Sequence, residues 1–371
     1  MQIKLMNSTY MSKPRIVDLF CGCSGLGLGA RQAGFAVPLS VDIDPILTSS
    51  HRLNFTSGKL LLSDLQSMSG GDVIEAAGGQ SIDGIVGGPP CQGFSSIGRA
   101  DPADPRRELL SAFFRIVVEA RPRFFIMENV RGLLFPKNRP LLDAALERVS
   151  SHYEIVGPLV IDAADFGAAT RRVRIFVVGY DKNSVDPINV DAIINSHVPP
   201  STVKDAISDL ADTTSAGLAE GFDQWTYGGS NEISEYAAKM RGEGNHTTTS
   251  HRKIAHEPEI SERFAKIAQG ATDPVGRHPR LAWLGQAPTI RAGTGPDKGS
   301  YQAVRPLHPS EPRVITVREA ARLQGFPDWF RFHPTAWHSF RMIGNSVSPF
   351  VSKTLLNLIY ERVQDMPIAA E

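Results

Sequence analysis

The chain has 371 residues, of which 42% are hydrophobic, and its 39 Lys and Arg residues balance 39 Asp and Glu residues. This length and composition exclude a disordered chain and predict about two domains, or one large domain with an inserted module. The zero net charge neither demands nor excludes a polyanionic partner, so any nucleic-acid surface must come from local charge asymmetry.

The three cysteines are an odd number and include the close pair Cys21 and Cys23. They do not indicate a disulfide framework or a zinc site, and they are typical of a reducing compartment. Residues 1–14 lack the apolar core of a secretion signal, and no run of about 18 apolar residues could cross a membrane. We therefore expect a soluble cytoplasmic protein with no metal site.

Residues 15–180 alternate between strand-like apolar runs and helical patterns such as 108–120. This rhythm predicts an α/β fold with a mostly parallel sheet covered on both faces, in which a last pair of strands closes the unit. The expected strands are 16–20, 37–41, 60–62, 82–86, 124–127, 153–162 and 173–180.

Gly, Thr, Ser, Pro, His and Arg dominate residues 181–312, where only 203–210 and 257–268 have helical patterns. We expect a second, loop-rich domain there. Regular patterns return at 316–323, and a helix is predicted to start near Pro349 and to pack back on the first domain. The predicted limits are 1–180 for the first domain, 181–312 for the second and 313–371 for the C-terminal segment.

Residues 18–29 lead from a strand through a glycine-rich turn into a helix, which is a place where a ligand can lie against the backbone. A tight structural turn would show the same glycines, and their spacing is not that of the dinucleotide fingerprint. Asp42 ends the second strand, where a carboxylate can accept both ribose hydroxyls, and Asp64 follows the third. A nucleoside cofactor without a pyrophosphate indicates S-adenosylmethionine.

Residues 87–95 read Gly-Gly-Pro-Pro-Cys-Gln-Gly-Phe-Ser and follow the apolar run 82–86. They end the expected strand in a sharp turn and place Cys91 at the C-terminal edge of the sheet, where open α/β sheets bind ligands. A lone cysteine is more often an inert core residue. The glycines, the prolines and the neighbouring Gln and Ser exceed what core packing requires, so Cys91 is a candidate nucleophile.

Charged residues are expected at the same edge. Glu128 directly follows the strand 124–127, and although an isolated Glu is usually a solvated surface charge, the apolar strand before it favours burial. Arg172 and Arg174 would point the same way and could face one site. Surface arginines that flank an edge strand would show the same pattern.

Six motifs stand in the order and spacing of the DNA (cytosine-5) methyltransferases of bacterial restriction-modification systems, which the chain resembles. The resemblance covers most of 15–180 and 313–360. It implies a Rossmann-like S-adenosylmethionine-dependent methyltransferase fold, with 181–312 as a smaller, loop-rich target-recognition domain. The motifs are residues 18–29, 88–95, 127–130, 172–174, 318–327 and 344–347.

The resemblance makes Cys91 the nucleophile, Glu128 the contact to the amidine edge of cytosine, and Arg172 and Arg174 its electrostatic partners. Some members stack a Trp on the adenine where this chain has Ile43, so we expect weaker packing there. The implied S-adenosyl-L-methionine site comprises Phe20, Gly22, Gly25, Leu26, Asp42, Ile43, Asp64, Leu65, Pro90, Leu109, Asn345 and Val347.

Polar and basic residues are the predicted DNA contacts, because Arg, Asn and Thr can read base edges and Lys can hold phosphate. Thr289 and Ile290 match the Thr-Leu pair of the family. A solvated polar loop is the alternative for any one of these residues. The predicted contacts are Gln92, Ser95, Arg241, Asn245, Arg252, Arg277, Thr289, Ile290, Arg291, Lys298 and Arg305.

The predicted function is methyl transfer to C5 of a cytosine flipped out of double-stranded DNA, which would protect that DNA from a separate cognate restriction endonuclease. We expect a monomer that associates with the nucleoid. An RNA cytosine-5 methyltransferase on the same scaffold is the alternative within enzymes, and a catalytically silent DNA-binding regulator is the alternative outside them. A nicotinamide-dependent oxidoreductase would need the dinucleotide loop that is missing.

Overall fold

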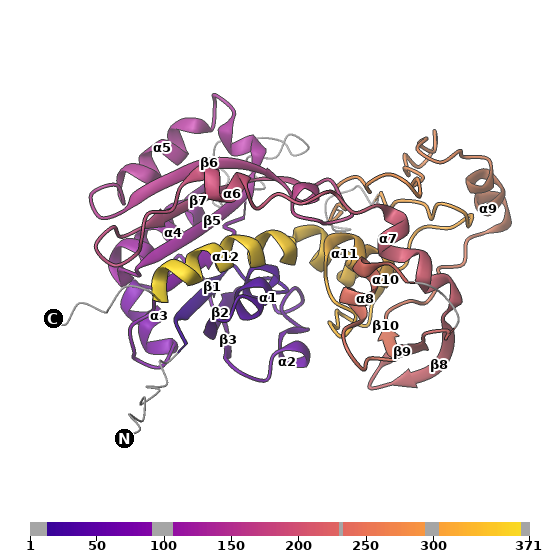
Figure 1. Cartoon of the computed structure of the whole chain (residues 1–371), viewed down its shortest axis with the longest axis horizontal. Coiled ribbons are helices and arrows are strands. Elements are labelled where there is room, and N and C mark those ends of the chain that lie inside the picture. The colour runs from indigo at the N-terminus through magenta and orange to yellow at the C-terminus, as the bar shows by residue number, and fades with distance from the viewer. Residues whose placement is uncertain (1–12, 91–106, 230–232, 294–303, 365–371) are drawn as a thin grey trace, which may run out of the picture.

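A computed structural model of the chain describes residues 13–90, 107–229, 233–293 and 304–364. Figure 1 shows two halves side by side, a larger half that contains the main sheet and a smaller half that contains a second sheet. The helix α12 (Pro349–Gln364) lies along the larger half. No helix within the described ranges is long and apolar enough to span a membrane.

The main sheet has seven strands in the order β3-β2-β1-β4-β5-β7-β6 within the described residues. The first five strands along the chain pair in parallel, and β7 is antiparallel to both β5 and β6. The predicted, mostly parallel α/β sheet with a closing strand pair is thus confirmed. The strands are β1 (Arg15–Leu19), β2 (Ala36–Asp42), β3 (Lys59–Leu62), β4 (Gly84–Gly87), β5 (Phe124–Val130), β6 (Glu154–Asp162) and β7 (Val173–Tyr180).

The sheet is buried between two layers because alternate side chains of each strand enter opposite cores. In β5, Phe124 and Ile126 join the core beneath α1 and α12, whereas Phe125 and Met127 join the core beneath α3, α4 and α5. The helices of these layers are α1 (Gly25–Gln32), α3 (Gly70–Ala76), α4 (Arg107–Ala120), α5 (Arg139–Glu147) and α6 (Val190–Ile194). The short helix α2 (His51–Asn54) precedes Phe55, which joins the core of the smaller half instead.

The smaller half holds more regular structure than its composition predicts. A three-stranded antiparallel sheet of order β10-β9-β8 is present, and all residues of β8 are exposed, so they carry no alternating apolar pattern. The predicted helices 203–210 and 257–268 are both found, each shorter than expected. The elements are α7 (Val203–Ile207), β8 (Thr214–Ala219), β9 (Phe222–Thr226), α8 (Glu235–Arg241), β10 (Thr247–Thr249), α9 (Pro258–Ala265), α10 (Val317–Gln324) and α11 (Ala336–Asn345).

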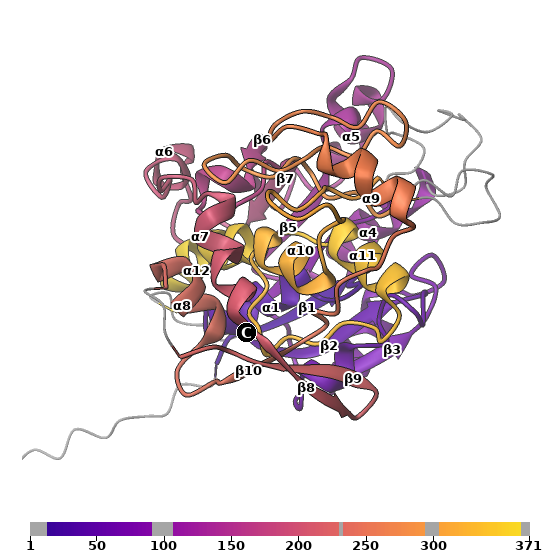
Figure 2. The same cartoon turned by 90° about the vertical axis from the view of Figure 1, so that its right-hand side faces the viewer.

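The C-terminal segment takes part in both halves. α12 packs against α1, while α10 and α11 share a hydrophobic core with α7 and α8. Figure 2, which views the smaller half, shows α7 and α8 to the left of α10 and α11, with the main sheet behind them. Arg322 of α10 has no exposed surface and binds Asp209 at 2.5 Å and Asp328 at 2.6 Å, so an internal ion network joins α10 to the α7 region.

Candidate active site

The turn between β1 and α1 is shaped by residues with unusual backbone angles. Phe20, Gly22 and Ser24 all have positive φ, at 54°, 50° and 59°. A Cβ added to Gly25 would lie 2.3 Å from the carbonyl O of Val347, and one added to Gly22 would meet nothing within 4 Å. The turn is therefore pressed against residue 347 on one side and faces open space on the other.

Asp42 at the end of β2 lies against this turn. Its Oδ2 accepts a hydrogen bond from the amide of Gly22 and its Oδ1 accepts one from the amide of Asp44, each at 2.8 Å. A carboxylate oxygen has two acceptor sites, so each oxygen keeps one for a further donor. Burial raises the pKa of Asp42. Ile43 beside it is 65% exposed, which leaves an apolar surface next to a carboxylate.

The structure separates the other predicted cofactor residues by exposure. The side chains of Leu26 and Leu65 are buried in the two cores that flank the sheet, at 5% and 2% exposure, so they support the site from beneath. Asp64 accepts a hydrogen bond from the amide of Gln66. Pro90 and Asn345 are exposed and Leu109 is partly exposed, whereas Val347 is buried at 7% exposure.

Glu128 is buried at the C-terminal end of β5, and the Nε of Arg174 lies 3.1 Å from its Oε1. The parallel register of β4 and β5 brings the turn after β4 next to it. A Cβ on Gly88 would lie 3.2 Å from Oε2 of Glu128, and Asn129 donates a hydrogen bond to the carbonyl O of Pro89 at 3.2 Å. Burial raises the pKa of Glu128, and the charges of Arg174 and Arg172 oppose that rise.

Arg172 is 3% exposed and lies just before β7. Its backbone amide donates to Oδ1 of Asp162 at 2.7 Å, and its Nη2 donates to the carbonyl O of Gly344 at 2.9 Å. Arg174 is thus paired with Glu128 and Arg172 is buried, so they are not the surface arginines of the alternative interpretation. Cys91, Gln92, Ser95 and Lys298 lie outside the described residues.

The predicted DNA contacts do not form a uniform group. Arg252, Arg277 and Arg291 are exposed. Ile290 is 1% exposed inside the core of the smaller half, so the structure gives it a packing position and no DNA-facing surface. Asn245 is partly buried and donates to the carbonyl O of Arg241.

Three further predicted contacts are held by internal interactions. Arg241 bonds Asp209 at 2.6 Å, and its guanidinium lies 4.0 Å from the ring centroid of Tyr227, so its charge is used within the protein. Arg305 similarly lies 4.2 Å from the ring of Phe340. Thr289 donates its hydroxyl to the carbonyl O of Arg171 at 2.7 Å. For Arg241 in particular, the structure indicates a stabilising position instead of an exposed DNA contact.

Asp18 and Gly344 are site residues that the sequence interpretation did not assign individually. Burial raises the pKa of Asp18 to about 7, and its Oδ2 accepts a hydrogen bond from the amide of Gly27 in the glycine-rich turn. A carboxyl group inside the apolar strand 15–19 was the signal available for Asp18. Gly344 offered no signal beyond its motif, because its contacts come from residues far away in the sequence.

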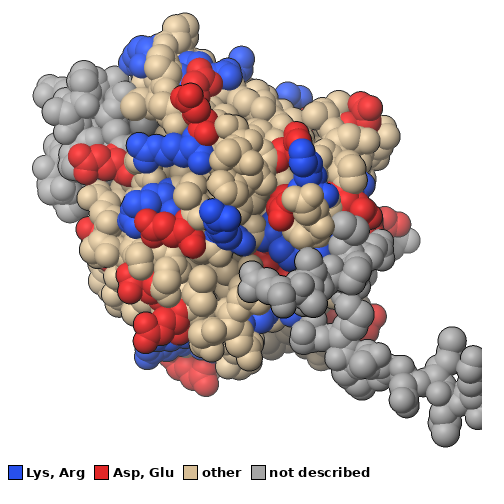
Figure 3. Space-filling model, turned by 90° about the vertical axis from the view of Figure 1, so that its left-hand side faces the viewer, with Lys and Arg blue, Asp and Glu red and all other residues tan. Residues whose placement is uncertain are grey.

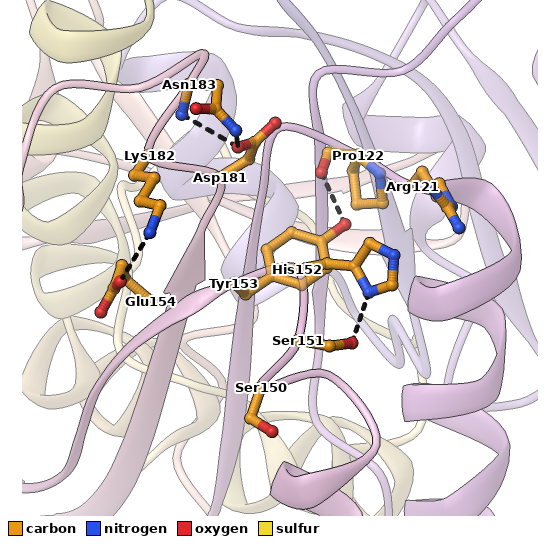
Figure 4. A pocket seen from close by; sticks show the side chains of 10 residues that line it. All are labelled: Arg121, Pro122, Ser150, Ser151, His152, Tyr153, Glu154, Asp181, Lys182 and Asn183. Atoms are coloured by element: carbon orange, nitrogen blue, oxygen red, sulfur yellow. Dashed lines mark hydrogen bonds and ion pairs between the residues drawn. The ribbon is translucent and has the colours of Figure 1, made fainter.

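A hollow shown in Figure 4 lies outside this site. Its lining includes His152, Tyr153 and Asp181, and Tyr153 donates its hydroxyl to the carbonyl O of Pro122, just before β5 begins. Glu128 lies toward the other end of that strand. The hollow therefore lies at the edge of the sheet opposite the candidate active site.

Comparisons of the sequence with a family model and with known proteins agree on one family. Residues 14–361 match the family model of the C-5 cytosine-specific DNA methylases. The Type II methyltransferase M.XorII of Xanthomonas oryzae pv. oryzae is 38% identical over 96% of this chain and 87% of its own length. M.DdeI of Desulfomicrobium norvegicum is 30% identical over 93% of this chain and 88% of its own length.

Solved structures agree with this match. A protein of an E. coli prophage, described as a DNA modification methyltransferase, superposes with a TM-score of 0.83 at 36% identity, over 95% of this chain and all of that chain. The S. pombe Dnmt2 methyltransferase, at 15% identity, covers 94% of this chain and 99% of its own with a TM-score of 0.61, which shows a shared fold. The chain therefore belongs to the C-5 cytosine-specific DNA methylases.

Proposed function

We propose that this protein methylates C5 of a cytosine within a specific sequence of double-stranded DNA, with S-adenosyl-L-methionine as methyl donor. The observation that carries this proposal is the buried Glu128–Arg174 ion pair beside the turn that leads into Cys91. A carboxyl group held in that position can hydrogen-bond the amidine edge of a cytosine placed against the thiol.

The turn after β1 fits the cofactor. Asp42 retains acceptor capacity for the ribose hydroxyls, Ile43 presents an apolar face for the adenine, and the space above Gly22 admits a ligand against the backbone. Asn345 and Phe20 would complete the wall. When bound, S-adenosyl-L-methionine supplies a methyl group attached to a positively charged sulfur.

Cys91 would start the reaction, because C5 of cytosine is too weak a nucleophile to accept a methyl group directly. A thiolate that adds to C6 makes C5 enamine-like. An unperturbed thiol with a pKa of about 8.5 is only about one tenth ionised at pH 7.5, so a positive neighbour would increase the reactive fraction. Arg172 and Arg174 supply positive charge at this edge of the sheet.

Glu128 would neutralise the charge that develops on the ring by giving a proton to N3 of cytosine. Burial raises the pKa of Glu128 in the direction that this role requires, and the charge of Arg174 opposes that rise. We propose that the proton reaches Glu128 only when the flipped base displaces solvent. After C5 has accepted the methyl group, loss of the C5 proton, departure of the Cys91 thiolate and return of the N3 proton to Glu128 restore the aromatic ring.

The smaller half would recognise the DNA, with 181–312 as the proposed recognition domain. Its exposed Arg252, Arg277 and Arg291 are the best-placed contacts among the described residues. Acidic and basic side chains are interspersed on the face of the larger half that is turned away from the smaller half (Figure 3). A DNA-binding surface is expected to be mainly basic instead. We propose that the protein acts as a monomer in the cytoplasm, on the nucleoid.

The names of the relatives support a role in restriction-modification, in which methylation protects DNA from a separate endonuclease. Genomic DNA from cells that express the protein should then resist one restriction endonuclease of a panel with different recognition sites. DNA from cells that express Cys91→Ala should remain sensitive. Sensitivity to every enzyme in both samples would argue against a protective role at those sites.

A covalent trap tests the chemistry. Purified protein is incubated with S-adenosyl-L-methionine, tritiated on the methyl group, and mixed-sequence DNA that contains 5-fluorocytosine, which cannot lose its C5 substituent as a proton. We expect a denaturation-resistant tritiated adduct that disappears in Cys91→Ala. Glu128→Gln should slow adduct formation by about 10²- to 10⁴-fold, the usual range for a lost proton donor. Absence of any adduct, on DNA and on RNA, would refute the proposal.

A further inference from the structure

Gly344 lies where three parts of the candidate active site meet. It is buried in the last turn of α11, and its carbonyl O accepts the 2.9 Å hydrogen bond from Nη2 of Arg172. The next residue along the chain is Asn345, which is proposed to line the cofactor pocket. A catalytic arginine and a cofactor residue are thus connected through one peptide.

The third part is the recognition segment, here residues 287–292. A Cβ added to Gly344 would lie 2.4 Å from the amide N of Ala292 and 2.6 Å from the carbonyl C of Arg291. These partners are backbone atoms, which cannot rotate away as a side chain would. Since Arg291 is an exposed candidate DNA contact, the backbone that touches Gly344 carries a residue proposed to meet DNA.

The same segment is held at a second point, on the other side of Arg172. The amide of Arg171 donates to the carbonyl O of Ala287 at 2.8 Å, and the hydroxyl of Thr170 donates to the same oxygen at 3.1 Å. Thr289 returns a hydrogen bond to the carbonyl O of Arg171. The recognition segment therefore contacts Arg171, which precedes Arg172 in the chain, and also Gly344, whose carbonyl O accepts the hydrogen bond from the guanidinium of Arg172.

We infer that Gly344 is a positioning residue that transmits the placement of the recognition segment to the guanidinium of Arg172. When DNA moves Arg291 and Ala292, the closely packed end of α11 must move with them. The hydrogen bond from Nη2 of Arg172 to the Gly344 carbonyl O then moves the guanidinium as well. The arginine then reaches its working position only when the recognition segment is correctly engaged. This inference rests on the proposed function, because it assigns Arg172 to the reaction.

Gly344→Ala tests the inference, with Gly70→Ala as a matched control. A Cβ on Gly70 would lie 2.5 Å from the amide N of Ala120, which is a backbone clash of the same size between α3 and α4, far from this site. Thermal stability, cofactor affinity, DNA affinity and the single-turnover rate of methyl transfer are measured for both variants, with DNA and S-adenosyl-L-methionine saturating.

We expect similar losses of thermal stability in the two variants but a slower transfer only in Gly344→Ala. The decrease should be about 10- to 100-fold, as expected for disturbing one hydrogen bond to a charged group. Cofactor affinity should stay close to that of the wild type. Equal transfer rates in the two variants would overturn the inference, and so would a defect confined to cofactor affinity.

If Gly344→Ala does not fold, Thr170→Val decides, since it removes the hydroxyl that holds Ala287 and keeps the side-chain shape. A slowed single turnover with unchanged cofactor affinity supports positioning through the segment, and a wild-type rate overturns it. The wild-type protein in the same assay reports on the proposed function itself. If the wild type transfers no methyl group, the proposed function fails. If the wild type transfers a methyl group and the variants do so at the same rate, this inference alone fails.

Discussion

Two carboxyl groups of this protein, those of Asp18 and Glu128, lie where burial raises their pKa values. Glu128 and Asp18 are both buried carboxyl groups, yet Glu128 is paired with a cation, whereas Asp18 lies beneath the glycine-rich turn and accepts a backbone hydrogen bond. For Asp18, desolvation is the largest effect and the charge of Arg31 only partly offsets it. The consequence is a proton that the folded protein keeps near neutral pH and the unfolded chain does not.

The buried carboxyl of Asp18 should make stability depend on pH. Its pKa is raised from 3.8 to about 7, so between these pH values the folded state holds a proton that the unfolded state has lost. The contribution of Asp18 to the free energy of unfolding should therefore fall by about 1.4 kcal/mol per pH unit as the pH rises from about 4 to about 7, and then level off. Asp18→Asn, which can still accept from Gly27, should lack this fall.

Urea titrations of both proteins at several pH values between 4 and 8 measure the effect. The difference in unfolding free energy between wild type and Asp18→Asn should change across this range and become constant above pH 7. Two curves that stay parallel over the whole range would show that Asp18 has an ordinary pKa.

At the scale of elements, the main sheet was predictable because its strands are apolar on both faces and end in polar residues. In β5, Phe124 to Met127 supply side chains to both cores, and Glu128 follows them at the sheet edge. The exposed strand β8 gave no such pattern, because its pairing depends on backbone bonds to β9 and on no buried side chain. Composition alone made the smaller half look less regular than it is.

The candidate site likewise has some positions that could be predicted from the sequence and others that could not. The positions of Asp42 and Glu128 follow from strand ends, which local sequence reveals. The burial of Ile290 and the internal pairing of Arg241 do not, because they depend on a core and an ion network assembled from distant segments. The contact of Gly344 with Ala292 is of this second kind, since only the fold brings the two backbones together.

The crossing of α1 and α12 should tolerate no side chain at Gly29. A Cβ there would lie 2.1 Å from Oγ of Ser352 and 2.6 Å from the amide N of Lys353. Gly29→Ala should therefore lower the free energy of unfolding by about 1–3 kcal/mol, the usual range for an overpacked core. Gly71→Ala, in α3, is the control, because its nearest atom is 3.6 Å away.

Chemical denaturation compares the two alanine variants. Alanine is favoured over glycine in a helix by roughly 0.5–1 kcal/mol, so Gly71→Ala should be neutral or slightly stabilising. Equal stability of Gly29→Ala and the wild type would mean that the two helices can separate at little cost.

At the scale of the whole molecule, the two halves are held together by a shared interior as well as by connecting chain. Asn54 of α2 exchanges hydrogen bonds with the backbone of Arg331, and Arg341 of α11 lies 3.4 Å from Asp44, just after the proposed cofactor carboxylate Asp42. The ion network of Arg322 continues this connection inside the smaller half. The regions proposed for DNA recognition and for cofactor binding are therefore joined by direct contacts.

Arg322→Met should be among the most damaging changes away from the active site. It would leave the carboxylates of Asp209 and Asp328 buried without their shared cation. We expect a loss of about 3–5 kcal/mol in the free energy of unfolding, which is typical of breaking a buried ion pair. Urea denaturation monitored by tryptophan fluorescence measures it.

Arg139→Met provides the comparison for this prediction. Arg139 pairs with Asp143 at 2.7 Å on an exposed helix surface, where both side chains are about half exposed. Loss of such a pair costs about 0.5 kcal/mol or less. If the two methionine variants were equally stable, the network around Arg322 would contribute little to the fold.

The contact between Gly25 and Val347 has a consequence during protein synthesis. A ribosome makes the glycine-rich turn and the strand-end carboxylates first, and the wall at residue 347 emerges only after the strands of the main sheet and the smaller half. A nascent or prematurely terminated chain would carry Cys91 and the proposed DNA contacts, but it would lack the residue proposed to complete the pocket for the methyl donor. We therefore expect methyl transfer to begin only after residue 347 has been made, so that shorter fragments could occupy DNA but could not mark it.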